Sequence, residues 1–141
     1  MTEKEKIHSG DIYYPSGDEI LNEQLKCMEN LSDFNLTRPS ELDKRSKLLK
    51  EMFAEIGEGC YIEPPLRANW GGKNVHFGKN VYANFNLTLV DDTHIYVGDF
   101  TMFGPNVVKK LEDIEVYKYD ADTLEISYDV LTKLGYKLHQ K

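Results

Sequence analysis

The chain has 141 residues, which is enough for one domain with a hydrophobic core. Its 17 Lys and Arg against 24 Asp and Glu give a net charge of −7 without a basic run, which argues against a nucleic-acid partner. No apolar run approaches the roughly 20 residues of a membrane span, and the N-terminus lacks the apolar core of a signal peptide, so we expect a cytoplasmic protein with no membrane partner.

The first third of the chain has the pattern of helices. Thr2 and Glu5 have the spacing of a capping box, and Gly10 can end the short helix that they begin. A second helix is predicted to start near Ser16 and Asp18. Apolar residues three and four apart predict the single face by which it packs: Ile20, Leu21, Leu25, Met28 and Leu31.

A third helix is predicted to follow Pro39, with a cap at Ser40 supported by Asp43 and an end at Gly57. Its apolar side consists of Leu42, Leu48, Leu49, Met52, Phe53 and Ile56. Its charged side is interpreted as a solvated surface rather than a binding site; this side consists of Glu41, Lys44, Arg45, Lys47, Lys50 and Glu51.

Residues 60–74 hold two prolines and two adjacent glycines, which predicts an irregular connection between the helices and the strands and turns downstream. Cys27 and Cys60 have no metal-ligand spacing, so we interpret them as free, reduced thiols in apolar space. No metal site is predicted.

A six-residue period runs through residues 75–108. The apolar residues that lead the units are Phe77, Ala83 and Leu89, and then, after two extra residues, Val97 and Phe103. A second set stands four places after most leaders, at Val81, Leu87, Thr101 and Val107, and a glycine directly follows three leaders, at Gly78, Gly98 and Gly104.

This period predicts a mainly β fold, a parallel β-helix in which each unit makes one short strand and one turn. Each leader then points into the axis of a stacked coil, and glycine or asparagine serves the sharp turns because both tolerate positive φ. An antiparallel hairpin sheet, which would show a period of two, remains the alternative.

The six-residue pattern stops after Val108, where a charged break is followed by a strand-like IEVYKY and a helix-like TLEISYDVLTKL that Gly135 can end. We therefore divide the chain into a helical cap over residues 1–57, a β-helix over 58–108 and a divergent tail, strand then helix, over 109–141.

Several segments in this order resemble the maltose and galactoside O-acetyltransferases of the hexapeptide-repeat superfamily: MTEKEKIHSGDIYYPS, FNLTRPSELDKRSKLLKEMF, GEGCYIEPP and VYANFNLTLVDDTHIYVGDFTMFGPNV. The resemblance spans about residues 1–108. It implies a left-handed parallel β-helix behind a helical cap, and a homotrimer whose active sites lie between neighbouring subunits. It also implies transfer of an acetyl group from acetyl-CoA, the co-substrate, to a hydroxyl of a sugar acceptor.

Matching the family's motif residue by residue gives candidate site residues. Asn84 corresponds to an asparagine near the reacting centre and is the candidate catalytic residue. Asp92 corresponds to a carboxylate that binds sugar hydroxyls, and Tyr82 lines the same surface. Asn69 and Trp70 lie where the family contributes to the acceptor pocket.

The residues alone also allow a simpler interpretation, which stays open. In it, Asn84 is a turn residue, and Asp91 and Asp92 form a solvated corner.

The chain departs from the family's pattern in two places. Tyr14 stands where the family has an aspartate in a YDPS-like segment. After GPNV the chain reads VKKLEDIEVYKYD, whereas the family continues with an ATxGHP-like segment, whose histidine is the general base, and with coils that bind coenzyme A. The family pattern is thus truncated after GPNV. Among the histidines, His94 lies nearest in sequence to the candidate site and is interpreted as a surface residue.

Three functions stay open at this point. The chain is a sugar O-acetyltransferase of impaired activity, or a non-catalytic module that self-associates through its coil, or a module that binds a sugar through Asn84, Asp92 and Tyr82 without acetylating it.

Overall fold

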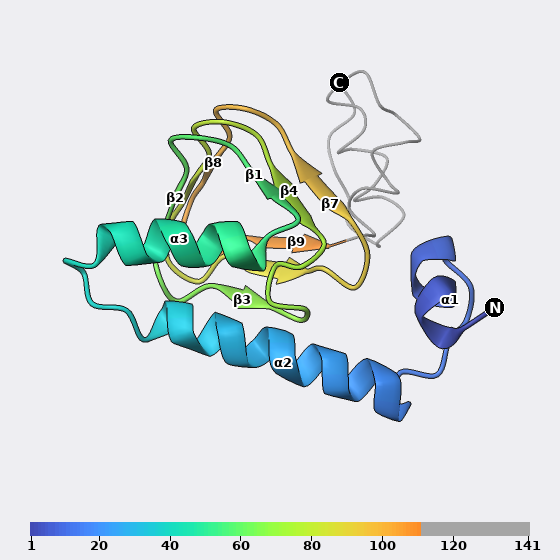
Figure 1. Ribbon diagram of the computed structural model, residues 1–141. Helices are drawn as coiled ribbons and strands as arrows, with labels where there is room; N and C mark the ends of the chain where they lie inside the picture. Colours follow the sequence, from blue (N-terminus) through green and yellow to red (C-terminus); the bar gives the residue numbers. More distant parts are fainter. Residues whose placement is uncertain (111–141) are drawn as a thin grey trace, which may run out of the picture. The chain divides into compact units, whose positions relative to one another are not determined.

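Three helices precede nine short strands in the computed structural model, which describes residues 1–110 (Figure 1). The strand and helix predicted over residues 109–141 lie, from residue 111 on, outside the described residues. The helices are α1 (Glu3–Ser9), α2 (Asp18–Asn35) and α3 (Leu42–Met52). The strands are β1 (Glu55–Ile56), β2 (Tyr61–Ile62), β3 (Arg67–Ala68), β4 (Val75–Phe77), β5 (Tyr82–Ala83), β6 (Thr88–Val90), β7 (Ile95–Val97), β8 (Met102–Phe103) and β9 (Val108–Lys110).

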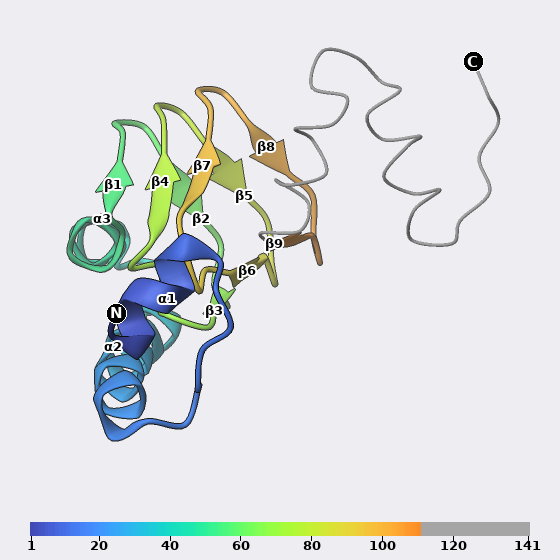
Figure 2. The same ribbon diagram turned by 90° about the vertical axis from the view of Figure 1, so that its right-hand side faces the viewer.

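The strands form three parallel sheets, ordered β1-β4-β7, β2-β5-β8 and β3-β6-β9. Each turn of the chain contributes one strand to each sheet, so the sheets are the three sides of a triangular coil (Figure 1), and the turns stack along its axis (Figure 2). Ile56, Phe77 and Val97 lie in one register, 21 and 20 residues apart. The parallel pairing confirms the β-helix and rules out the hairpin sheet.

The residues that lead the six-residue units fill the interior of the coil. Phe77, Ala83, Leu89 and Val97 are at most 8% exposed, as predicted. Phe103, in the last described coil, is half-buried. Their burial supplies the apolar contact between coils, since the ring centroids of Phe77 and Phe103 lie 6.2 Å apart.

Turns between strands place a residue at positive φ three positions after the leader. Asn80, Asn86 and Asn106 have φ of 55°, 63° and 63°, which asparagine tolerates better than other residues with a side chain. Phe100 holds the same turn position, with φ of 61°, although its bulky side chain makes this conformation unfavourable. The prediction that glycine or asparagine serves these turns is confirmed by the asparagines and by Gly59, with φ of 75°, whereas the glycines directly after the leaders do not have positive φ.

Gly57 and Gly78 serve the close approach of successive coils, whereas a Cβ on Gly98 or Gly104 would meet nothing within 4 Å among the described residues. A Cβ on Gly57 would lie 2.6 Å from the carbonyl oxygen of Gly78 and 2.8 Å from the backbone nitrogen of Lys79 in the next coil. Because both atoms belong to the backbone, neither can move aside without shifting the coil.

Helix α1 is formed as its sequence predicts. The Thr2 hydroxyl accepts a hydrogen bond from the Glu5 N–H at 3.1 Å, and the Glu5 carboxylate accepts one from the Thr2 N–H at 2.7 Å. Gly10 ends the helix in the left-handed conformation, with φ of 83°.

Helix α2 buries a different face from the predicted one. Ile20 and Leu31 are buried, together with Phe34, whereas Leu21, Leu25 and Met28 are 40–60% exposed. The helix lies beside β3 (Figure 1) and also contacts α3, so residues that face neither element remain at the surface. Within the described residues, α2 therefore has more apolar side chains than β3 and α3 bury.

Helix α3 is shorter than predicted. Glu41 occupies the N-cap position without a side-chain cap hydrogen bond, so the predicted Ser40 cap does not form. Phe53 is already extended, and Glu55–Ile56 is the first strand of the coil rather than the end of a helix. The helix lies across the first coil, and the Phe53 ring packs edge-on against Phe77 with centroids 5.0 Å apart.

Arg45 on α3 is buried, which contradicts its assignment to a solvated side. Its Nε donates to the Thr37 hydroxyl at 2.8 Å, and its Nη1 donates to the Tyr61 hydroxyl at 3.0 Å. It therefore ties the α2–α3 connection to the β2 strand. No helix within residues 1–110 combines the length and apolar character needed to cross a bilayer.

The close approach of coils predicts unequal effects of alanine at equivalent positions. Gly57→Ala should lower the free energy of unfolding by about 1–3 kcal/mol, because the new methyl group meets fixed backbone. Gly98→Ala is the matched control, since a Cβ there meets nothing within 4 Å among the described residues. Urea denaturation measures both; an equal loss would contradict the packing role of Gly57.

The strained turn predicts a stabilising substitution. Phe100→Asn should raise the free energy of unfolding by about 1 kcal/mol, because asparagine accepts positive φ and the 72% exposed Phe100 ring loses little packing. Phe85→Asn removes another exposed phenylalanine at ordinary φ and serves as the control in the same thermal melts. Equal gains from both variants would show that exposure, not φ, is responsible.

Candidate functional site

Asn84 and Tyr82 point outward from the wall of β5. Between them Ala83 is fully buried, and side chains alternate along a strand, so its neighbours face the outside. The Asn84 carboxamide oxygen accepts the Phe85 N–H at 2.7 Å, and its N–H groups have no partner among the described residues. Because Asn86, and not Asn84, holds the positive φ of this turn, the turn conformation does not require an asparagine at position 84.

The Tyr82 ring belongs to an aromatic ladder on the same wall. It stacks on Tyr61 of the preceding coil with ring centroids 6.3 Å apart, and Met102 follows in register in the next coil. Met102 is 76% exposed, so this wall offers an apolar surface beside the free amide of Asn84.

Asp92 and Asn69 lie together at another place on the coil. They follow β6 and β3, which are paired in one sheet, and the Asn69 Nδ2 donates to the Asp92 Oδ1 at 3.3 Å. Asp92 also lines a small cavity of about 10 Å³ with Lys4, His8 and Lys73. Tyr13 lies close enough that its pKa is raised, first by burial and then by the Asp92 charge.

Asp91, by contrast, is a structural residue. Its side chain is fully buried, and its two carboxylate oxygens accept the Trp70 N–H at 2.7 Å and the Gly72 N–H at 2.8 Å. Burial raises its pKa, although these hydrogen bonds oppose the shift. The solvated-corner interpretation is therefore wrong for Asp91, whose contacts shape the loop that carries Asn69 and Trp70.

Trp70 is packed between the helices and the coil. It is 5% exposed and forms one apolar cluster with Ile7 of α1 and Ile20 of α2. Its remaining surface contributes to an open cavity of about 310 Å³ between α2 and the 70–73 loop. The main contacts of Trp70 are thus with the helical cap. Asn69, the preceding residue, is exposed.

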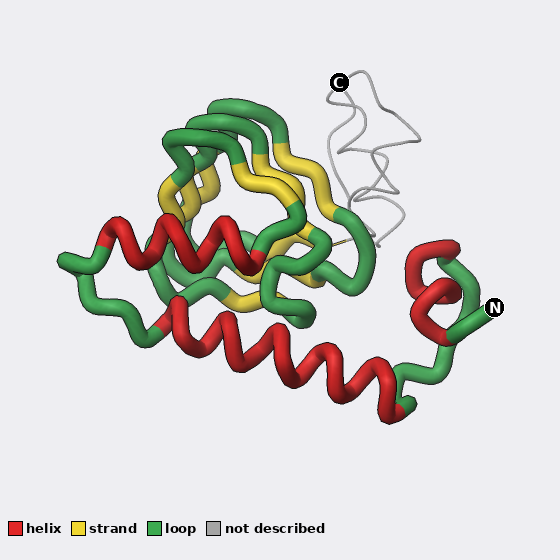
Figure 3. The backbone as a smooth tube through the Cα atoms, in the orientation of Figure 1, coloured by secondary structure: helices red, strands yellow, loops and turns green. Residues whose placement is uncertain are grey.

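The structure separates the candidate residues into two groups. Tyr82 and Asn84 precede the turn after β5, whereas Asn69 and Asp92 lie in the loops after β3 and β6. These turns are at different corners of the triangular coil (Figure 3). One copy of the described chain therefore does not bring the two groups together.

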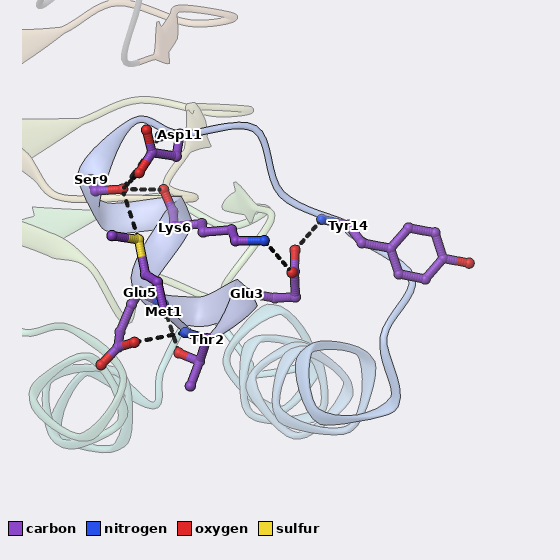
Figure 4. Close-up of polar contacts among 8 residues, drawn as sticks. All are labelled: Met1, Thr2, Glu3, Glu5, Lys6, Ser9, Asp11 and Tyr14. Atoms are coloured by element: carbon purple, nitrogen blue, oxygen red, sulfur yellow. Dashed lines mark hydrogen bonds and ion pairs between the residues drawn. The ribbon is translucent and has the colours of Figure 1, made fainter.

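Tyr14, which stands in place of the family's aspartate, points away from the α1 helix into solvent (Figure 4). It is 65% exposed, and its backbone N–H donates to the Glu3 carboxylate, which also pairs with Lys6.

Sequence reasoning missed a chain of hydrogen bonds on the outer face of β1-β4-β7. The Glu55 carboxylate forms a hydrogen bond with the His76 Nδ1, and the His76 Nε2 forms one with the His94 Nδ1 at 2.8 Å. Glu55 and His76 are paired in register, so the 21-residue repeat of the coil was the signal that could have placed them together.

The chain matches a family model described as the maltose acetyltransferase hexapeptide capping motif over residues 6–57. It is 52% identical over 102 residues to a galactoside O-acetyltransferase of Lactococcus lactis subsp. lactis (strain IL1403), covering 72% of this chain and 49% of that protein. It is 40% identical over 107 residues to a galactoside O-acetyltransferase of Escherichia coli (strain K12), covering 76% and 52%.

Two solved structures are similar in fold. A maltose O-acetyltransferase from Clostridium difficile 630 aligns with a TM-score of 0.74 at 35% identity, covering 77% of this chain and 57% of that one. A galactoside acetyltransferase in complex with coenzyme A aligns with a TM-score of 0.74 at 39% identity, covering 79% and 55%.

These findings, with the stacked coils and the inward leaders, define a hexapeptide-repeat protein with a left-handed parallel β-helix and an N-terminal helical cap. The chain belongs to the maltose and galactoside O-acetyltransferase family. It spans about half the length of the curated relatives that it matches.

The different burial of the two adjacent aspartates predicts different effects on stability. Asp91→Ala should lower the free energy of unfolding by about 2 kcal/mol, because two buried N–H groups lose their acceptor. Asp92→Ala should change it by no more than about 0.5 kcal/mol. Urea denaturation followed by Trp70 fluorescence measures both, and equal losses would contradict the structural role assigned to Asp91.

Proposed function

We propose that the chain is a cytoplasmic, acetyl-CoA-dependent O-acetyltransferase acting on sugar hydroxyls, of the maltose or galactoside type. The observation that carries this proposal is the placement of Asn84 with Tyr82, and of Asp92 with Asn69, at two corners of the coil. Two adjacent copies can bring unlike corners together. A homotrimer with acceptor sites between subunits is therefore part of the proposal.

Each residue has a chemical role in this reaction. A sugar hydroxyl attacks the thioester carbonyl of acetyl-CoA, its proton passes to a base, and collapse of the tetrahedral intermediate breaks the C–S bond and releases the thiol. The free N–H groups of Asn84 can donate to an oxygen at the reacting centre. Asp92 can accept hydrogen bonds from sugar hydroxyls, and the Tyr82 ring can pack against the apolar face of the sugar.

Exposed apolar side chains support self-association. Large apolar side chains that are exposed in one copy would stabilise an assembly that buries them. Those at least half exposed in the helices and coils are Leu25, Leu36, Leu42, Phe85, Tyr96, Phe100, Met102 and Val108.

We propose that this activity is impaired, because a general base is not identified. The sequence after Val108 lacks the ATxGHP-like segment that supplies this base in the family. Within residues 1–110, His76 and His94 bond to each other, and His8 bonds the Thr93 hydroxyl, all on the β1-β4-β7 side.

The lack of an identified general base also favours a second candidate function. Asn84 has no histidine among its hydrogen-bond partners in the described residues. A non-catalytic module that binds a sugar or self-associates would need the acceptor residues and the coil, but not a base.

Substitutions at the two corners should separate binding from chemistry. Asp92→Asn should weaken galactoside or maltose binding about tenfold or more, because a charged acceptor contributes about 1.5–3 kcal/mol. Asn84→Ala should lower kcat with a smaller effect on KM. Glu29→Gln, on the exposed side of α2, is the control.

Calorimetry measures sugar binding, and thiol release from acetyl-CoA measures transfer. Saturable sugar binding that depends on Asp92 without any transfer would favour the second candidate. No sugar binding and no transfer would refute both sugar-directed functions.

The proposed trimer has a simple physical consequence. Light scattering should report about 49 kDa, three times the chain mass of 16.3 kDa. A mass of 16.3 kDa at micromolar concentration would contradict a site shared between subunits.

A further inference from the structure

Three imidazoles from different parts of the chain are packed together where α1 meets the coil. The His8 ring of α1 stacks on the His94 ring with centroids 5.2 Å apart, and its Nδ1 bonds the Thr93 hydroxyl at 2.9 Å. His76 of β4 lies 5.0 Å from His94 between ring centroids. His76 also stacks on Tyr96 of β7 at 4.3 Å.

The hydrogen-bond chain limits how many protons this group can hold. Because the Glu55 carboxylate can only accept, the His76 Nδ1 carries a hydrogen, and the neutral chain has the His94 Nδ1–H donating to the His76 Nε2. One added proton can go to the His94 Nε2, which leaves that bond in place. A second would place N–H groups of both rings against each other at 2.8 Å, so the bond cannot survive with both rings charged.

Helix α1 is held to the rest of the molecule by few other contacts. It has only seven residues, of which only Ile7 is buried, against Ile20 and Trp70. Outside the histidine group, Lys4 pairs with Glu23 of α2 at 2.8 Å. A helix of this length is not stable by itself, so its docking depends on these contacts.

Titratable and charged groups from several elements surround the three imidazoles. His94 faces His8 from α1, His76 from β4 with Glu55 of β1 behind it, and Tyr96 from β7. The cavity beside His8 is lined by Lys4, Lys73, Glu23 and Asp92, and Glu23 pairs with both lysines. Only the imidazoles among these groups change charge between about pH 5.5 and 8 in their ordinary ranges.

The direction of the pH effect follows from His94. His94 is exposed overall, and its pKa is lowered, first by partial desolvation of the ring and then by His76 and His8. The docked form therefore binds fewer protons than the undocked form, in which His94 keeps His76 as a neighbour but no longer faces His8, so that its pKa lies closer to the ordinary value of about 6.5. Docking is complete above that pH and weakens as the pH falls below it.

We propose that His8 and His94 form a pH-sensitive clasp that holds α1 against the coil at neutral pH and releases it in mild acid. Release removes Lys4, Ile7 and His8 from the cavity that Asp92 lines and exposes the Asp92 carboxylate. The clasp is a property of the fold and does not depend on the proposed acetyl transfer.

Trp70 reports the docking directly, because it is the only tryptophan of the chain and packs against Ile7. Between pH 8 and pH 5.5 the emission of the full chain should shift to the red, and acrylamide quenching should rise. Amide exchange, corrected for its intrinsic pH dependence, should show a severalfold fall in protection at Ile7. The Tyr61 amide, which bonds the Val81 carbonyl inside the coil at 2.9 Å, should keep its protection.

Substitutions identify the groups that titrate. His94→Gln and His8→Gln should each flatten the pH dependence of Trp70 emission. Lys4→Met is the control, because it weakens docking at all pH values and should leave the pH dependence in place. The clasp would be overturned if the Trp70 emission did not change with pH, or if either histidine variant kept the wild-type pH profile. It would also be overturned if the Tyr61 amide lost its protection together with the Ile7 amide.

Discussion

Every other feature of the structure depends on the stacking of one coil directly on the next. Backbone hydrogen bonds run between coils, as from the Tyr61 N–H to the Val81 carbonyl oxygen and from the Tyr82 N–H to the Thr101 carbonyl oxygen. They require the side chains inside to repeat in register, because a slip of one residue would turn the apolar leaders outward. The buried residues Phe77, Leu89 and Val97 satisfy that requirement.

The Asp92 and Asn69 half of the candidate site lies where the six-residue repeat is interrupted. The loops after β3 and β6 hold extra residues, which lengthen the coil repeat to 21 and then 20 residues. The buried Asp91 carboxylate ties these two loops together through the N–H groups of Trp70 and Gly72. Asp92 and Asn69 are thus presented by the two loops that deviate from the repeat.

The helical cap is held to this corner through the same loops. Trp70 joins Ile7 and Ile20, and Thr93 bonds His8, so the segments that shape the Asp92 corner also dock α1. The Asp92 corner and the N-terminal helix are therefore coupled by direct contacts. This coupling gives the histidine cluster a position from which its charge can affect access to Asp92.

Much of this fold could be predicted from the sequence, because the period of six and the Thr2 capping box act through local geometry. The six-residue spacing determined which residues fill the coil. The family pattern pointed to Asn84 and Asp92, whose outward or loop positions agree with a candidate site but do not by themselves assign its chemistry.

Only the tertiary structure decided which of several similar residues are buried. Asp91 and Asp92 are adjacent in sequence, yet one is buried because two N–H groups converge on it, and the other lies at the surface of a loop. Arg45 was expected at the surface and is buried, whereas Leu25 was expected to be packed and is exposed. Burial depends on which element packs opposite a residue, and the periodicity within one helix does not contain that information. His76 and His94 came together for the same reason, since their contact is made by the register between coils.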